Sequence, residues 1–300
     1  MGWPAIFYCC ALMGGIWVFF WQFVAARSPH DCKRMHEREK QYLLSKSELV
    51  LKTKKQKLQI PFKQMIRSGP FLALLGCAFS INIIVTFMHA YQPTFLKEVL
   101  FLSPVYNGLF GAIPPLVEIF CKFAWSLWMD SLKQRKILSA TAAVKISQLI
   151  AGVFTALFFA MIGFFADCEQ PFVTLFLLCG VAIALSTTAS GFFTSILSIA
   201  PAYTGLISSS TMTVGITARV ITPILVSHFN RTGTIAEWRP IFLIIAGTTA
   251  LSTAFFVAFG SGDLQDWAKQ PYEDKSKIEL EEIEKENEIE VDTIAAELIP

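Results

Sequence analysis

Long apolar runs separated by short polar segments dominate this sequence. Each run extends over about 20 residues or more, the length that a helix needs to cross a hydrocarbon layer of roughly 30 Å. The first run has no basic residue before it and is too long for the apolar part of a signal peptide, so it also predicts a span. The pattern therefore predicts an all-α membrane protein with seven transmembrane helices, at roughly residues 3–25, 70–91, 107–128, 144–165, 171–195, 204–229 and 238–259.

Basic residues gather between the first and second predicted spans. Lys and Arg crowd into residues 27–67, whereas the loop at 166–170 contains neither. Because cytoplasmic loops are enriched in Lys and Arg, we expect the loop at 26–69 to be cytoplasmic. Alternation of the spans then places residues 129–143 and the tail after residue 260 on the same side. The amino terminus is expected on the outer or lumenal side.

The composition agrees with a membrane protein. Apolar residues make up 54% of the chain, charged residues make up 16%, and the mean hydropathy is +0.52. In an ordinary soluble domain about a quarter of the residues are charged. The seven cysteines fall mostly inside apolar runs without metal-ligand spacing, so we interpret them as small apolar residues. We expect no metal site, no cofactor and no nucleic-acid partner.

One predicted span carries a charge near its middle. Arg219 lies in the run 204–229, at a depth where an arginine costs from about 3 to more than about 10 kcal/mol. Such a residue is tolerated where it faces a protein interior or a water-filled cavity. Helical spacing places further small and polar residues on the same stripe, namely Ser208, Thr211, Gly215 and Thr222. This polar face makes Arg219 the leading candidate for binding an anionic substrate.

The third span carries two charges of opposite sign. Glu118 and Lys122 are one helical turn apart, a spacing at which their side chains can touch. Two interpretations stay open. The pair is a structural ion pair that fixes helix packing, or Glu118 is a proton-titrating group and Lys122 contacts the substrate. Together with Arg219, the deep positions carry one more positive than negative charge, which favours an anion as the substrate.

Several other residues inside or near the spans are candidates. Asn82 is a candidate substrate-binding or helix-contact amide, and His89 is either structural or a lumenal pH sensor that takes part in ion coupling. The prolines Pro114, Pro115 and Pro223 are expected to break the third and sixth spans. These are the middle spans of two three-span groups, and such matched interruptions are typical of inverted repeats in transporters.

A glycosylation sequon lies on a predicted lumenal loop. Asn230-Arg231-Thr232 has the required pattern of Asn, any residue except Pro, and Thr. The sequon sits at the end of a helix and close to the bilayer, where the modifying enzyme has limited access. Asn230 is therefore a weak candidate for glycosylation.

Motifs spread over residues 2–268 resemble those of one transporter family. The chain resembles the carboxy-terminal half of a major facilitator superfamily transporter, and in particular the anion/cation symporters that include sialin, the vesicular glutamate transporters and the type I sodium–phosphate cotransporters. The order and spacing of several short stretches carry the resemblance: Gly2–Tyr8, Pro93–Leu100, Asn107–Leu109 with Ile113–Pro114, Ile199–Gly205, Glu237–Phe242 and Gly260–Ala268.

The resemblance implies a domain organisation. Residues 1–25 would be the last helix of the amino-terminal bundle and 26–69 the basic cytoplasmic central loop. Residues 70–259 would be the carboxy-terminal six-helix bundle, followed by an acidic cytoplasmic tail at 260–300. The seven spans would correspond to helices six to twelve, and the missing amino-terminal helices of the same transporter would be a partner. Asp130 and the basic residues after it resemble the family's cytoplasmic gating motif.

The sequence also departs from the family. Members often have an Asn-His-x-Asp run before Ile-Ala-Pro, where this chain has Ser195, Ile196 and Ser198. The vesicular glutamate transporters have an arginine where this chain has Ile81, and relatives tend to have a small residue where it has Arg219. These differences argue against glutamate and leave the substrate open.

The implied function is transport of a small organic or inorganic anion, coupled to H⁺ or Na⁺ by alternating access, in the plasma membrane or a lysosomal or vesicular membrane. A truncated, non-transporting half of such a protein is the alternative. A seven-helix receptor is a remote alternative, because the first cytoplasmic loop is too long and receptor motifs are lacking. An enzyme is not expected, since the sequence has neither a His-Glu-x-x-His motif nor paired intramembrane aspartates.

Overall fold

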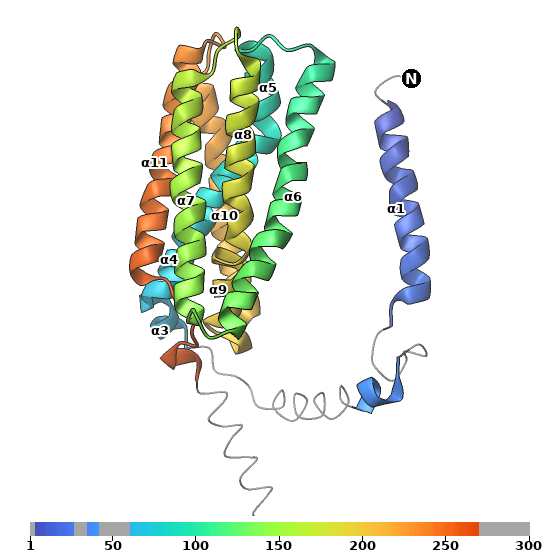
Figure 1. Ribbon diagram of the computed structural model, residues 1–300, viewed down its shortest axis with the longest axis vertical. Coiled ribbons are helices and arrows are strands. Elements are labelled where there is room, and N and C mark those ends of the chain that lie inside the picture. The colour runs from blue at the N-terminus through green and yellow to red at the C-terminus, as the bar shows by residue number, and fades with distance from the viewer. Residues whose placement is uncertain (1–3, 27–34, 42–60, 270–300) are drawn as a thin grey trace, which may run out of the picture. The chain divides into compact units, whose positions relative to one another are not determined.

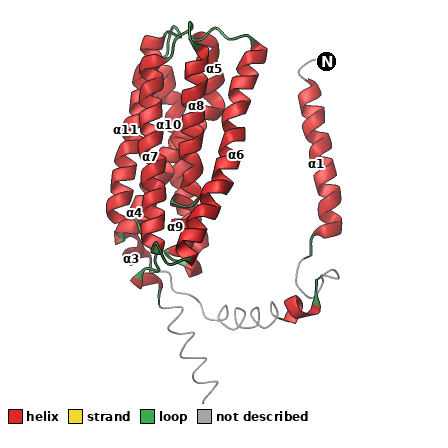
Figure 2. Cartoon of the chain, viewed as in Figure 1, coloured by secondary structure: helices red, strands yellow, loops and turns green. Residues whose placement is uncertain are grey.

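A computed structural model describes residues 4–26, 35–41 and 61–269. The chain divides into two compact units, residues 1–60 and 61–300. The described residues form helices, turns and loops but no strand (Figure 2). Most of the predicted basic loop, and the acidic tail beyond residue 269, lie outside the described residues.

The first unit contains helix α1, Pro4–Val24, which has 21 residues. At a rise of about 1.5 Å per residue, α1 is about 31 Å long, enough to cross the hydrocarbon layer. Its bounds agree with the span predicted at residues 3–25.

The second unit is a bundle of long, roughly parallel and antiparallel helices (Figure 1). Six of its helical segments are long and apolar enough to cross a membrane, so the described residues contain seven candidate spans in all. This confirms the predicted number of spans and the all-α fold class. The helices of this unit are α3 (Phe62–Arg67), α4 (Gly69–Thr86), α5 (Gln92–Glu98), α6 (Pro104–Gln134), α7 (Ala140–Phe165), α8 (Pro171–Ser186), α9 (Phe192–Ser198), α10 (Thr204–Phe229) and α11 (Ile235–Phe259).

The prediction that prolines break the third and sixth spans is wrong. Helix α6 runs through Pro114 and Pro115, and α10 runs through Pro223, without interruption. A proline inside a helix leaves the carbonyl four residues earlier without its usual N–H donor. For Pro114 that carbonyl belongs to Phe110, and the side-chain Nε2 of Gln92 donates to it at 3.4 Å. A neighbouring helix thus supplies the missing donor, and α6 continues.

The helical irregularities fall in other spans. The fifth predicted span is divided into α8 and α9 by a 3₁₀ turn at Thr187–Ala189, within a polar stretch at residues 186–191. The second span changes to a π-helix at Phe87–Tyr91 before α5 begins. Such local changes of helix type are common at functional sites.

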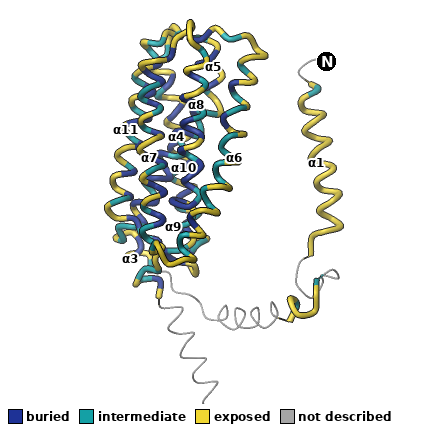
Figure 3. Tube along the Cα trace, viewed as in Figure 1, coloured by how far each residue is buried: buried dark blue, intermediate teal, exposed yellow. Residues whose placement is uncertain are grey.

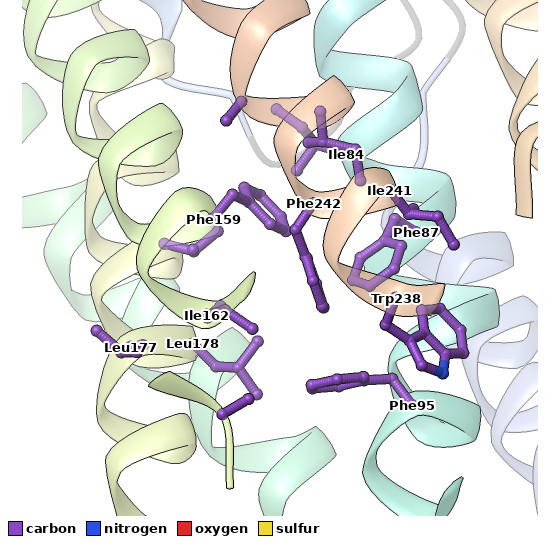
Figure 4. Packing of buried hydrophobic residues seen from close by; sticks show 14 of the residues in the cluster. Ile84, Phe87, Phe95, Phe159, Ile162, Leu177, Leu178, Trp238, Ile241 and Phe242 are labelled. Carbon is purple, nitrogen blue, oxygen red and sulfur yellow. The ribbon is translucent and has the colours of Figure 1, made fainter. Parts of the chain in front are cut away.

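Helix pairing within the second unit defines its core. Helix α7 packs on α11, α4 packs on α10, and α6 packs on α8. An aromatic cluster joins the π-helix Phe87–Tyr91, α5, α7 and α11 (Figure 4). In this cluster the ring centroids of Phe95 and Phe242 are 4.9 Å apart, and those of Phe87 and Phe242 are 5.2 Å apart. These edge-to-face contacts bury large apolar surfaces and fix the helices against one another.

Two helices of this bundle are less buried than the others. Only 11% of the apolar window of the α6 span and 22% of that of the α10 span are buried, against 39% to 56% for the other spans of the bundle. Figure 3 shows the scarcity of buried positions along α6. Both helices therefore present much of their surface outside the bundle, toward lipid or another protein element.

The segment after α11 is held against the start of α7. Thr141 Oγ1 donates to Asp263 Oδ2 at 2.6 Å, and the backbone N–H of Gly262 donates to Thr141 Oγ1 at 2.9 Å. Ser195 Oγ, from α9, donates to the carbonyl of Ser261 at 2.6 Å. Segments that the charge pattern predicts to be cytoplasmic thus meet at one end of the bundle.

Close packing of α7 on α11 generates a prediction. A Cβ atom at residue 152 would lie 1.7 Å from Thr253 Oγ1, whereas a Cβ atom at the exposed Gly247 would meet nothing within 4 Å. We expect Gly152→Ala to destabilise the bundle by about 1–3 kcal/mol through overpacking. Gly247→Ala is the matched control and should be neutral or stabilising, because alanine loses less backbone entropy in a helix. Thermal unfolding in detergent micelles measures both; equal Tm values for the two variants would contradict the packing.

Candidate functional site

Arg219 and Asn82 meet across the contact between α10 and α4. The Nε–H of Arg219 donates to Oδ1 of Asn82 at 2.9 Å. The Nδ2 of Asn82 in turn donates to the carbonyl of Ala78, one turn earlier on α4, at 2.8 Å. The second bond orients the amide so that its oxygen faces the guanidinium. The structure therefore brings together two residues that the sequence put forward separately as substrate-binding.

A glycine on α10 makes this contact possible. A Cβ atom at residue 215 would lie 2.5 Å from Nδ2 of Asn82, closer than any real contact allows. Gly215 lies one turn before Arg219 on the same face of α10. Because residue 215 has no side chain, the Asn82 amide can lie over the helix surface and reach the arginine.

Asn82 and Arg219 line a groove of about 510 Å³. This volume lies within the range of pockets that bind small molecules. Its walls come from α4, α9 and α10, and are mostly apolar, with a few polar groups: Asn82, Ser208, Thr211 and Arg219. Helix α9 contributes Phe192, Phe193, Ile196 and Leu197. The sequence analysis missed these wall residues, because apolar residues inside an apolar run carry no signal that separates a groove from a core.

The charge of Arg219 is not balanced within the described part of the bundle. Its side chain is exposed, and its recorded partner is a neutral amide. Over residues 61–269, the ion pairs of the carboxylates involve lysines and not Arg219. The groove thus carries a positive charge that a bound anion could neutralise.

The predicted polar stripe on α10 is divided between the groove and the bundle interior. Ser208, Thr211 and Arg219 line the groove. Thr222, by contrast, is buried, and its hydroxyl donates to the carbonyl of Ala218 at 2.8 Å. Part of the stripe therefore serves helix packing and part of it faces the groove.

Glu118 and Lys122 form an ion pair on α6, with Nζ and Oε1 2.8 Å apart. Both side chains are partly exposed, at 30% for Glu118 and 44% for Lys122. Neither residue is among those that line the groove. The structure therefore does not place Lys122 beside Arg219 and Asn82, and the substrate-binding and proton-coupling roles of this pair stay predictions.

The remaining candidates lie away from the groove. His89 is exposed in the π-helix of the second span, and Asp130 is exposed at the end of α6, where its Oδ1 is 2.6 Å from Nζ of Lys133. Asn230 follows α10, and its Nδ2 donates to Oε2 of Glu98 at 3.0 Å. The pH-sensing, gating and glycosylation roles stay predictions. Among the described residues, no group of three or more His, Cys, Asp and Glu side chains is placed to hold a metal ion.

Comparison with known proteins places this chain in a family. The family model described as Major Facilitator Superfamily matches residues 1–215. The transporter slc-17.3 of Caenorhabditis elegans is 36% identical over 96% of the chain and 56% of its own length. Sheep sialin is 30% identical over 89% of the chain and 53% of its own length. Sodium-dependent phosphate transport protein 1 of rat is 28% identical over 90% of the chain and 57% of its own length.

The chain spans about half the length of these curated relatives. Its seven candidate spans, its all-helical bundle and the family match over residues 1–215 agree with one another. The chain is a multi-pass membrane protein that belongs to the Major Facilitator Superfamily.

Proposed function

We propose that this chain forms one wall of a transport site for a small organic or inorganic anion. The observation that carries the proposal is the groove beside Arg219, where a guanidinium within a membrane span has a neutral amide and no described carboxylate as its partner. An uncompensated charge at this depth is costly. A bound anion lowers that cost, and the site therefore favours a negatively charged ligand over a neutral one.

The geometry of Arg219 suits carboxylate or phosphate ligands. Its bond to Asn82 uses Nε, which leaves the Nη groups able to donate to a ligand. Guanidinium groups bind planar carboxylates and phosphates through paired, charge-assisted hydrogen bonds. The names of the relatives include a sodium-dependent phosphate transport protein, which supports an anion as substrate and Na⁺ as one coupling ion. H⁺ is the other candidate coupling ion.

The transport site would be completed by other helices. We infer that the seven spans correspond to helices six to twelve of a major facilitator fold, with α1 as the last helix of the first bundle. The exposed surfaces of α6 and α10 would then face the missing helices. Residues 26–69 would form the cytoplasmic central loop and 260–300 the cytoplasmic tail. The protein would act by alternating access, without enzymatic chemistry, in the plasma membrane or a lysosomal or vesicular membrane.

A non-transporting half is the second candidate, since the chain spans about half of its relatives. Sequencing the transcript upstream of Met1 distinguishes the two. Five further spans in frame would support the transporter, and a stop codon close upstream would support the half.

Removal of the Arg219 side chain tests its role in the groove. In a form that carries the upstream helices, Arg219→Ala should reduce anion uptake by about 100-fold or more, because charge-assisted bonds to the substrate are lost. Uptake into vesicles of a panel of anions that includes phosphate and glutamate measures this effect. Arg231→Gln, on the loop after α10, is the matched control and should leave uptake unchanged. Undiminished uptake by Arg219→Ala, at equal membrane insertion, would remove this residue from the site.

The near-isosteric change Asn82→Asp tests whether the free charge of Arg219 is needed. The new carboxylate would lie about as close to the guanidinium as the amide oxygen does now, at 2.9 Å, and would neutralise Arg219. We expect uptake to be abolished. Asn82→Ala removes the hydrogen bond to Arg219, worth about 1 kcal/mol, together with the bond to the Ala78 carbonyl, but leaves the charge of Arg219 free, and should raise KM only severalfold. If Asn82→Asp transports as well as Asn82→Ala, the free charge of Arg219 is not required.

Charge variants of Glu118 and Lys122 separate the two interpretations of the α6 ion pair. Exchange of the charges, with Glu118→Lys and Lys122→Glu together, preserves a pair of opposite charges at the same spacing. We expect the double variant to keep most of the uptake, while Glu118→Gln alone, which leaves Lys122 without its partner, lowers expression and Tm. Loss of proton-coupled uptake in a well-expressed double variant would instead assign the coupling proton to Glu118.

A further inference from the structure

The groove beside Arg219 is elongated, and its positive charge lies at one end. On α10 the lining begins at Ser208 and ends at Arg219. At a rise of about 1.5 Å per residue, these two positions are about 16 Å apart along the helix axis. A ligand whose anionic group binds Arg219 therefore has space for a body that extends along the groove. A small inorganic anion would occupy only the end of this space.

The walls around that space are apolar. Met212 and Ile216 lie one turn apart on α10, and Phe193 and Leu197 lie one turn apart on α9. All four side chains are more than half exposed, so their apolar surfaces are free to contact a ligand within the described chain. The ring of Phe193 also lies edge-to-face with that of Phe192, with centroids 5.1 Å apart. An apolar or aromatic body gains from burial against these walls.

The division of the fifth span brings α9 to the groove. Helix α8 packs on α6 and α7, whereas α9, beyond the 3₁₀ turn at Thr187–Ala189, also packs on α4 and α10. The division thus places Phe192 and Phe193 beside the two helices that hold Asn82 and Arg219. The aromatic wall and the guanidinium come from different parts of the chain and meet in one groove.

Most polar groups of the lining are already bonded within the protein. Both ends of the Asn82 amide are used, by Arg219 and by the carbonyl of Ala78. The hydroxyl of Thr211 donates to the carbonyl of Ser208 at 2.9 Å. A ligand body rich in hydroxyl groups would therefore find few partners on this wall, and each hydroxyl that is buried without a partner costs free energy.

The charge of the lining suits a ligand with one negative charge. Among the described residues that line the groove, Arg219 is the charged one, and none is a carboxylate. An ammonium group on the ligand would have no negative partner on this wall, and a second carboxylate would have no second cation. Burial of an unpaired charge is costly, so both kinds of ligand are disfavoured.

We propose that the substrate is an aromatic monocarboxylate. Its carboxylate binds the Nη groups of Arg219, and its ring lies between the apolar side chains of α9 and α10. This inference rests on the proposed function, because it names the substrate class of the same site. It disfavours inorganic phosphate, amino acids and sugar acids as substrates.

The test compares probes that differ by one chemical feature. Uptake of labelled 3-phenylpropionate, phenylalanine, gluconate and phosphate is measured in vesicles, in a form that carries the upstream helices, and the uptake by Arg219→Ala is subtracted. Phenylalanine adds an ammonium group to the skeleton of 3-phenylpropionate, and gluconate keeps the carboxylate on a hydroxylated chain. We expect the Arg219-dependent uptake of 3-phenylpropionate to exceed that of each other probe by at least about 10-fold.

A change in the apolar wall tests where the ring lies. Ile216→Thr places a hydroxyl on the wall and should lower the Arg219-dependent uptake of 3-phenylpropionate by about 3-fold or more. Ile224→Thr is the matched control, because Ile224 lies on the same helix, is 63% exposed against 62% for Ile216, and does not line the groove. This control should leave the uptake unchanged.

The outcomes separate this inference from the function on which it rests. If another probe shows Arg219-dependent uptake equal to that of 3-phenylpropionate, the substrate class is wrong, while the anion site stands. If no probe shows Arg219-dependent uptake, both proposals fail. Equal effects of Ile216→Thr and Ile224→Thr on 3-phenylpropionate uptake would mean that lipid or other helices cover this wall, and would also overturn the inference.

Discussion

In the hydrocarbon part of a bilayer, no water is available to hydrogen-bond a polar group, so each such group needs a partner inside the protein. The main-chain groups of this protein meet the requirement by forming long helices. Where Pro114 removes a donor, the side chain of Gln92 on the neighbouring segment supplies one to the carbonyl of Phe110. The Gln92 side chain thus replaces the donor that Pro114 removes, and α6 runs through both prolines as a single helix.

Charged side chains meet the same requirement in two different ways. Glu118 and Lys122 neutralise each other on one helix, with no remaining net charge. Among the described residues, Arg219 is paired with the Asn82 amide, which orients the guanidinium but does not cancel its charge. The first arrangement is self-sufficient, whereas the second keeps a positive charge available at the edge of a groove.

Small residues set the distances at which these polar groups meet. Gly215 lets Asn82 lie flat on α10, and Gly152 lets Thr253 approach the backbone of α7. Both close approaches bring together side chains from distant segments, Asn82 with α10 beside the groove and Thr253 with α7 inside the bundle. Membrane helices commonly rely on small residues for such packing, because lipid gives no hydrophobic force that draws helices together.

The sequence by itself determined the seven spans, their approximate bounds and the all-helical fold, because hydropathy and span length are local properties of the chain. It also identified Arg219 and Asn82 as unusual for their depth. Only the tertiary structure decided that these two residues, 137 positions apart, are hydrogen-bonded, and that Lys122 lies away from them. The break at Thr187–Ala189 lies in the polar stretch at residues 186–191, and the mean hydropathy of the whole span does not reveal that the helix is divided there. The partner of a buried polar group depends on how helices pack across the bundle, and no local pattern records that.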